Sequence, residues 1–293
     1  MATISSRAAG AALLVALSAG AAPKPQVIKL ERDSHDRPTA SVRVGNTWAR
    51  LLVDTGASTH VLSRRFLKEA LGAVPRGEPL GVNGLSGDAK DAVLLGDLAA
   101  VTRDGVALTL REPVAMVYDD DEDDGLLSPQ LLAVNAVVEL DLRAGTLTLH
   151  PPEDPLARET RSERCEPYDN LSLLFVAPTV VDGKAAPMLL DTGASYTALD
   201  SQSAAGAALA PRSSAAGRVK SLGGRTASRR VETKLEFAGQ KFGGEVRLVD
   251  GRAQGCDSVG HLGIDVLGGC RLRFAPTGVS ANCAAARPDA GRK

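Results

Sequence analysis

The sequence predicts a mostly β protein made of two similar halves. A segment of the first half recurs in the second, most apolar runs are short and alternate with polar residues, and glycine-containing turn signals separate these runs. The chain has 293 residues, 44% of them hydrophobic, so each half is long enough to bury a core of its own. We therefore expect two β domains within one chain.

The internal repeat is clearest around an aspartate. The heptapeptide LVDTGAS around Asp54 returns as LLDTGAS around Asp191, 137 residues later. With a two-residue adjustment near its end, the match runs from about residue 38 to 142 and from about residue 175 to 275. A match of this length indicates a tandem duplication.

Each half begins with the same pattern of two apolar runs that lead into the aspartate. In the first half these runs are 41–44 and 51–53, with a turn at 45–46, and in the second half they are 179–181 and 188–190, with a turn at 182–183. Further strands are expected at 93–95, 106–110 and 137–149, the last broken by a turn at 144–145, and short helices near 63–71 and 128–133.

The first 22 residues have the features of a secretory signal peptide. Arg7 precedes an apolar run from Ala8 to about Leu17, and Ala19 and Ala21 have the A-x-A spacing that signal peptidase recognises. The run is short for a membrane span, and a short membrane anchor is the alternative. We therefore expect a periplasmic or secreted protein with no stable membrane span after cleavage.

The rest of the chain divides at a polar segment that contains three prolines. After a signal peptide at 1–22, we expect an N-terminal half at 23–150, a linker at 151–164 and a C-terminal half at 165–293. Because each half carries one copy of the repeat, the two halves should be structural counterparts.

The four cysteines all lie in the second half, at Cys165, Cys256, Cys270 and Cys283. None has the C-x-x-C spacing of a zinc site, so no metal site is expected from them. An oxidising compartment favours two disulfides instead. Four cysteines allow three pairings, and the sequence does not choose among them.

The balance of charge excludes one class of partner. The chain has 34 basic and 35 acidic residues, a formal net charge of −1, and no long tail of one sign. Nucleic-acid-binding proteins usually carry a basic excess or stripe. We therefore expect no nucleic-acid partner.

Three local features allow more than one interpretation. The acidic run at 119–124 imitates the start of a calcium-binding loop, but no glutamate follows at the twelfth position, so a solvated acidic loop is favoured. His60, six residues after Asp54, is interpreted as a structural residue near the first loop. Basic residues surround a glycine-rich turn of the second half; they are Arg218, Lys220, Arg225, Arg229 and Arg230. They are interpreted either as ordinary surface charge or as one end of an asymmetric cleft.

The two Asp-Thr-Gly segments suggest a specific chemistry. An apolar strand that ends in this tripeptide places a carboxylate at the floor of a cleft, and the glycine permits close approach of another backbone. If the halves pack about a pseudo-two-fold axis, Asp54 and Asp191 meet across it. Two carboxyls about 3 Å apart share one proton, so one can activate a water as a general base while the other polarises a peptide carbonyl.

These motifs resemble those of the retropepsin-like aspartic protease family, with two halves fused in one chain. The shared features are hydrophobic-hydrophobic-Asp-Thr-Gly-Ala, a later glycine-rich hairpin, and a hydrophobic-hydrophobic-Gly segment that leads into a short helix. The resemblance implies two β-barrel halves of retropepsin or pepsin type, related by pseudo-two-fold symmetry, with a cleft between them. It also implies that no metal or organic cofactor is used.

The resemblance assigns roles to individual residues. Asp54 and Asp191 would form the catalytic pair. The supporting residues beneath them would be Thr55, Gly56, Thr192 and Gly193. The flap hairpins that close over substrate would contain Gly84, Leu85 and Gly87 in the first half and Leu222, Gly223 and Gly224 in the second.

We therefore expect an aspartic endopeptidase that acts on peptide or protein substrates. Since one chain supplies both aspartates, a monomer should be sufficient for activity. Two alternatives remain open: an inactive peptide-binding module that keeps the fold, and a protein whose halves pair with their counterparts in another chain.

Overall fold

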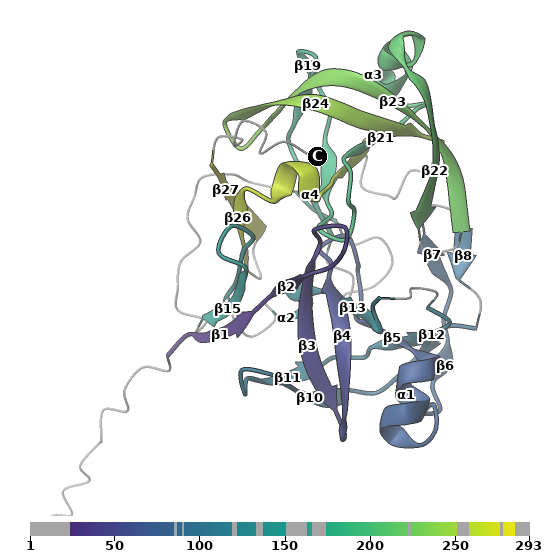
Figure 1. Ribbon diagram of the computed structural model, residues 1–293, viewed down its shortest axis with the longest axis vertical. Coiled ribbons are helices and arrows are strands. Elements are labelled where there is room, and N and C mark those ends of the chain that lie inside the picture. Colours follow the sequence, from purple (N-terminus) through teal and green to yellow (C-terminus); the bar gives the residue numbers. More distant parts are fainter. Residues whose placement is uncertain are drawn as a thin grey trace, which may run out of the picture.

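The computed structural model describes residues 24–84, 87–89, 91–118, 122–132, 137–150, 163–165, 174–221, 224–250, 258–275 and 278–284. Within these residues, strands form one large sheet in each half, a five-stranded sheet shared by both halves, and a two-stranded hairpin. Figure 1 shows the first half in purple to blue at the bottom and the second half in green at the top. The predicted mostly β fold with two similar halves is confirmed.

The large sheet of the first half is built around the strand that ends at Asp54. Its strands, in spatial order, are β11 (Ala107–Leu110), β10 (Leu98–Thr102), β3 (Pro38–Val44), β4 (Thr47–Val53), β13 (Gly125–Leu127), β5 (Val61–Ser63), β12 (Val114–Met116), β9 (Val93–Leu94) and β6 (Glu78–Pro79), and β2 (Glu31–Arg32) pairs with β3. Helix α1 (Arg64–Leu71) begins after Ser63, whose hydroxyl accepts a hydrogen bond from the Phe66 N–H as an N-cap. Its Phe66 and Leu67 are buried, which attaches the helix to the core.

The large sheet of the second half repeats this arrangement. Its strands, in spatial order, are β16 (Glu163–Cys165), β17 (Leu174–Ala177), β20 (Met188–Leu190), β25 (Gly260–Leu262), β21 (Ala198–Asp200), β24 (Gln240–Val249), β23 (Gly224–Phe237), β18 (Val180–Val181) and β19 (Lys184–Ala185), and β22 (Ser214–Ser221) pairs with β23. Helix α3 (Ala204–Leu209) follows β21 and continues into a 3₁₀ turn at Ala210–Arg212. Strand β20 pairs in parallel with β25 as β4 pairs in parallel with β13, so the two aspartates leave equivalent strand pairs.

The third sheet joins the two halves. Its strands, in spatial order, are β1 (Gln26–Lys29), β15 (Thr146–His150), β14 (Val137–Asp141), β26 (Cys270–Ala275) and β27 (Gly278–Cys283). Strand β14 of the first half pairs antiparallel with β26 of the second, at the left of Figure 1 where β1, β15, β26 and β27 are labelled. Arg271 contacts Asp141 at 2.7 Å and Arg273 contacts Glu139 at 2.8 Å across this pair. The relative position of the halves is therefore held by a continuous sheet.

A disulfide closes the outer edge of the joining sheet. Cys270 and Cys283 lie directly opposite each other on β26 and β27 and are bonded. This bond is one of the two predicted disulfides, and Cys256 lies outside the described residues.

Two hairpins lie where the flaps are predicted. In the first half, β7 (Val82–Gly84) pairs with β8 (Gly87–Ala89), with Gly84 opposite Gly87. In the second half, β22 pairs with the much longer β23, with Ser221 opposite Gly224. The predicted tip residues Leu85, Leu222 and Gly223 lie outside the described residues.

Two short helices, α2 (Pro129–Leu132) and α4 (Ile264–Leu267), each precede a strand of the joining sheet, β14 and β26 respectively. Each begins after one of the parallel strands, β13 or β25, so the predicted hydrophobic-hydrophobic segment leading into a short helix is present in both halves. In the described part of the chain, no helix has the length and hydrophobicity needed to cross a bilayer. The expected signal peptide at 1–22 lies outside the described residues.

Candidate active site

The two Asp-Thr-Gly loops interlock through their threonines. The Thr55 hydroxyl donates to the carbonyl of Leu190 at 2.8 Å, and the Thr192 hydroxyl donates to the carbonyl of Val53 at 2.6 Å. Each hydroxyl also accepts from the backbone N–H of the other threonine, at 3.0 and 3.1 Å. Both threonines are buried, so these four bonds fix the position of one loop relative to the other.

Each aspartate packs on the glycine of the opposite loop. A Cβ atom added to Gly193 would lie 2.5 Å from the Asp54 Cγ atom, and one added to Gly56 would lie 2.6 Å from the Asp191 Cγ atom. No side chain fits at either distance, so glycine is required at both positions for this close approach. The structure therefore brings Asp54 and Asp191 together, as the sequence predicts.

The strand ends hold both aspartates in equivalent positions. The Asp54 N–H donates to the carbonyl of Leu127 at 2.9 Å, and the Asp191 N–H donates to the carbonyl of Leu262 at 3.0 Å. These carbonyls belong to β13 and β25, the strands that flank the aspartate-bearing strands. Both side chains are half-buried at the surface between the two halves.

The electrostatics of the two carboxyls are those of a coupled pair. Desolvation by the surrounding protein and the neighbouring Asp191 raise the pKa of Asp54 well above its usual value. Desolvation also raises the pKa of Asp191, while hydrogen bonds from Asp54 and from the Ala194 N–H oppose this rise. Such a pair holds one proton over a range of pH, and the two titration steps belong to the pair.

A buried glutamine, Gln130 on α2, supports the first loop. Its Nε2 group donates to the carbonyls of Thr55 at 3.0 Å and Ala57 at 2.9 Å. The peptide group of the Thr55 carbonyl also contains the Gly56 N–H, which donates to Asp54 Oδ1 at 2.7 Å. Gln130 is not among the residues predicted for the site, although a polar residue between apolar neighbours in the segment after Leu127 is a signal for it.

His60 has a structural position that is matched in the second half. Its Nδ1 atom accepts from the Ser128 N–H at 3.1 Å, and at the equivalent place the Thr197 hydroxyl accepts from the Gly263 N–H at 3.0 Å. Both bonds tie the chain that follows the aspartate to the start of a short helix. His60 is fully buried, and burial lowers its pKa to about 4.

The described part of the acidic run is occupied by ion pairs and hydrogen bonds with the protein. Glu122 accepts hydrogen bonds from Ser34. Arg37 and Arg50 lie near Asp123, and Arg65 lies near Asp124. No cluster of potential metal ligands is found among the described residues. The basic residues predicted around the second hairpin lie on β22 and β23, and all five are exposed; they are Arg218, Lys220, Arg225, Arg229 and Arg230.

Removal of the Thr192 hydroxyl should loosen the contact between the loops. We expect Thr192→Val to lower the free energy of unfolding by about 2 kcal/mol, because the buried Val53 carbonyl and Thr55 N–H lose their partner. Urea denaturation measures this change, and Thr192→Ser is the matched control because it keeps the hydroxyl. Equal stability of the valine and serine variants would contradict the expected role of the hydroxyl.

The fold and the site together define a class of protein: two β halves that present interlocked Asp-Thr-Gly loops to each other, with paired carboxyls at their contact. The chain belongs to the aspartyl protease family, whose pattern matches it at residues 40–129 and again at 177–266, once in each half. The predicted resemblance and the internal duplication are thereby confirmed. A comparison with curated proteins gave no significant match.

Proposed function

We propose that this protein is a secreted aspartic endopeptidase in which Asp54 and Asp191 together activate a water molecule. The observation that carries the proposal is the reciprocal packing of each carboxyl on the glycine of the opposite loop. Two carboxyls in such contact share one proton, and this gives one general base and one general acid in the same site.

The singly protonated pair would be the reactive form. The carboxylate takes a proton from water, the water oxygen attacks the carbonyl carbon of the peptide, and the protonated carboxyl donates a hydrogen bond to the carbonyl oxygen. In the tetrahedral intermediate the C–N bond then breaks as the nitrogen receives a proton from the pair. The products are a new carboxyl group and a new amine, and the pair returns to its starting state.

The substrate would be an extended peptide. The hairpins β7–β8 and β22–β23 offer backbone donors and acceptors from both halves, as in recognition by strand addition. The predicted flap residues Gly84, Gly87 and Gly224 belong to these hairpins, where the absence of side chains allows a peptide backbone to approach.

Export and a monomeric state complete the proposal. The segment 1–22 would be removed as a signal peptide, and the disulfide Cys270–Cys283 is typical of an oxidising compartment. The mature chain would consist of halves at 23–150 and 165–293 and the linker between them. Because both aspartates come from one chain, a monomer would be active.

The test is cleavage of a mixed peptide library by the purified protein between about pH 3 and about pH 7, with the cut sites mapped by mass spectrometry. We expect cleavage with a bell-shaped dependence of the rate on pH. We also expect the active species to sediment as a single chain. Peptides that are retained but not cut would favour the inactive binding module. Activity that appears only in a dimer would favour pairing between chains.

A further inference from the structure

We infer that Arg37 and Gln130 make the two aspartates unequal, so that Asp191 carries the negative charge of the pair and Asp54 carries the proton. Each residue supports one aspartate through a single intervening peptide group. The donor behind Asp191 is a guanidinium cation and the donor behind Asp54 is a neutral amide. Both are positioning residues, since neither contacts the carboxyl that it influences.

Arg37 is held in place by two buried carboxylates of its own half. Its Nε group is paired with Asp33, and its Nη2 group lies 3.5 Å from Asp123 Oδ2. The side chains of Asp33 and Asp123 have no exposed surface, and that of Arg37 is only 15% exposed. Asp33 also accepts from the backbone N–H groups of His35 and Arg37, which fixes the turn that carries the arginine.

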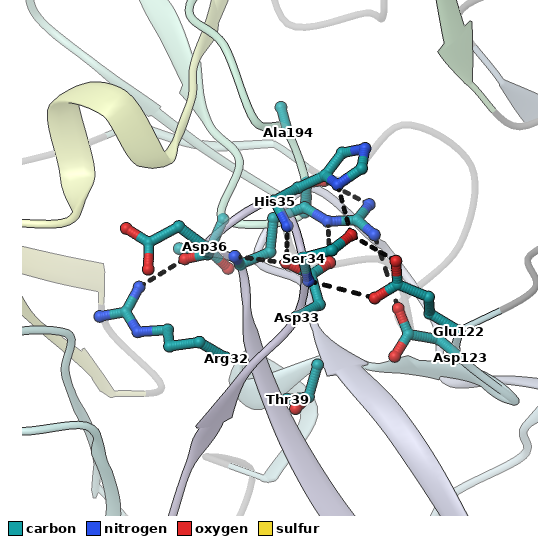
Figure 2. A network of polar contacts seen from close by, with 12 residues as sticks. Arg32, Asp33, Ser34, His35, Asp36, Thr39, Glu122, Asp123 and Ala194 are labelled. Atoms are coloured by element: carbon teal, nitrogen blue, oxygen red, sulfur yellow. Dashed lines mark hydrogen bonds and ion pairs between the residues drawn. The ribbon is translucent and has the colours of Figure 1, made fainter. Parts of the chain in front are cut away.

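From this position Arg37 reaches the loop of the other half. Its Nη1 group donates to the carbonyl of Gly193 at 3.3 Å. That carbonyl belongs to the same peptide group as the Ala194 N–H, which donates to Asp191 Oδ1 at 3.0 Å. In Figure 2, Ala194 of the second half lies beside the network that Asp33, Ser34 and His35 form in the first half. A chain of hydrogen bonds thus runs from a cation to Asp191, and such chains polarise each successive bond.

The corresponding chain to Asp54 starts from a neutral group. Gln130 donates to the Thr55 carbonyl, and the same peptide group donates through the Gly56 N–H to Asp54 Oδ1. A cation stabilises a nearby negative charge more strongly than a neutral amide does. The duplication does not supply a second arginine, because the position equivalent to Arg37 is the buried Leu174. The asymmetry is therefore built into the chain.

The other charged groups around the pair are consistent with a proton on Asp54 and a negative charge on Asp191. Arg37 lowers the pKa of both aspartates, and the pKa of Asp54 is the one raised well above its usual value. The groups that face Arg37 are Asp33 on its turn, Asp123 before β13 and Tyr118 after β12. His261 on β25 also interacts with Asp54, and burial lowers the pKa of its imidazole.

The test is a pH titration of the aspartate carboxyl carbons by ¹³C NMR in the full protein without substrate. The signals of the pair are assigned by their loss in Asp54→Asn and Asp191→Asn. We expect Asp191 to ionise first. In Arg37→Met both titration steps should move to higher pH, and the separation between them should narrow because Asp191 loses the cation behind it. Arg37→Lys should lie between Arg37→Met and the wild type, since it keeps the charge.

Arg50→Met is the matched control. The Arg50 guanidinium also lies near Asp123, at 3.5 Å, but it donates hydrogen bonds to Thr39 and to the carbonyl of Arg32 in the first half. We expect its removal to leave both titration steps in place. If Arg37→Met does not fold, Asp33→Asn/Arg37→Met removes the uncompensated charge and keeps the acceptor of the turn. The inference is overturned if Asp54 ionises first, or if removal of Arg37 changes the titration no more than removal of Arg50.

The assignment of Asp191 as general base rests on the proposed function, but the order of ionisation does not. The NMR titration needs no cleavage, so a protein that cuts no peptide would refute the protease proposal and leave the order of ionisation testable. Conversely, a protein that cuts peptides but ionises Asp54 first would refute only this inference.

Discussion

Asp54→Asn and Asp191→Asn are each expected to lower kcat by at least about three orders of magnitude, because residues that act as a catalytic unit lose nearly all of their effect when one is removed. An asparagine at either position removes one of the two sites between which the proton moves. Its amide still donates a hydrogen bond, however, and so imitates a protonated carboxyl in part. Asp54→Asn should therefore keep more residual activity than Asp191→Asn, in which the base is lost.

The measurement is kcat and KM on one peptide from the library, at the pH of maximal cleavage. Asp104→Asn is the matched control, since this exposed aspartate accepts a hydrogen bond from the Lys29 N–H far from the pair in sequence. Circular dichroism and denaturation show whether each variant is folded. Cleavage by a folded Asp191→Asn protein at a rate near that of the wild type would refute the proposed mechanism.

The pairing of the aspartates was predictable because it follows from a duplication. Two identical tripeptides in equivalent halves meet wherever the halves pack about a common axis, and the contacts of Gly56 and Gly193 show how closely they do so. The sequence also predicted α1, β14, β15, β20 and the end of β4, since short apolar runs with turn signals between them carry a strong local signal.

The sheet that joins the halves was not predictable in the same way. The segment of β14 was expected to be a strand, but its pairing with β26 depends on residues that are 130 or more positions apart in the chain. Local alternation indicates that a segment is a strand and does not indicate its partner. The ion pairs of Arg271 and Arg273 with β14 became recognisable only once the register was known.

The supporting residues of the site were missed for a related reason. Arg37 lies just before the start of the repeat, has no counterpart in the second half, and acts on a loop 156 positions away. Gln130 lies inside the repeat, but its equivalent is Asp265, which accepts from Thr197 instead of donating to the loop. A comparison of the two halves identifies what they share, whereas these residues distinguish one half from the other.

His60 should limit the stability of the protein in acid. Burial lowers its pKa from 6.5 to about 4, and its Nε2 group has no hydrogen-bond partner among the described residues. Between these values the unfolded chain binds a proton at this position and the folded chain does not. Above pH 6.5 His60 is neutral in both states and does not change the free energy of unfolding. As the pH falls from 6.5 to about 4, the free energy of unfolding decreases by about 3 kcal/mol, because only the unfolded chain binds the proton.

His60→Thr should remove this dependence, because the second half uses Thr197 to accept the equivalent hydrogen bond from Gly263. At neutral pH the smaller side chain leaves a cavity, and we expect the variant to be less stable than the wild type by roughly 1–2 kcal/mol. As the pH falls to about 4, the wild type loses stability that the variant keeps, so the two curves should converge and cross. Denaturant titrations at a series of pH values measure both curves, and the raised pKa values of Asp54 and Asp191 contribute equally to each. Parallel curves over this range would show that His60 does not set the acid limit, whereas crossing curves would show that one buried imidazole limits the acidity in which the paired carboxyls can work.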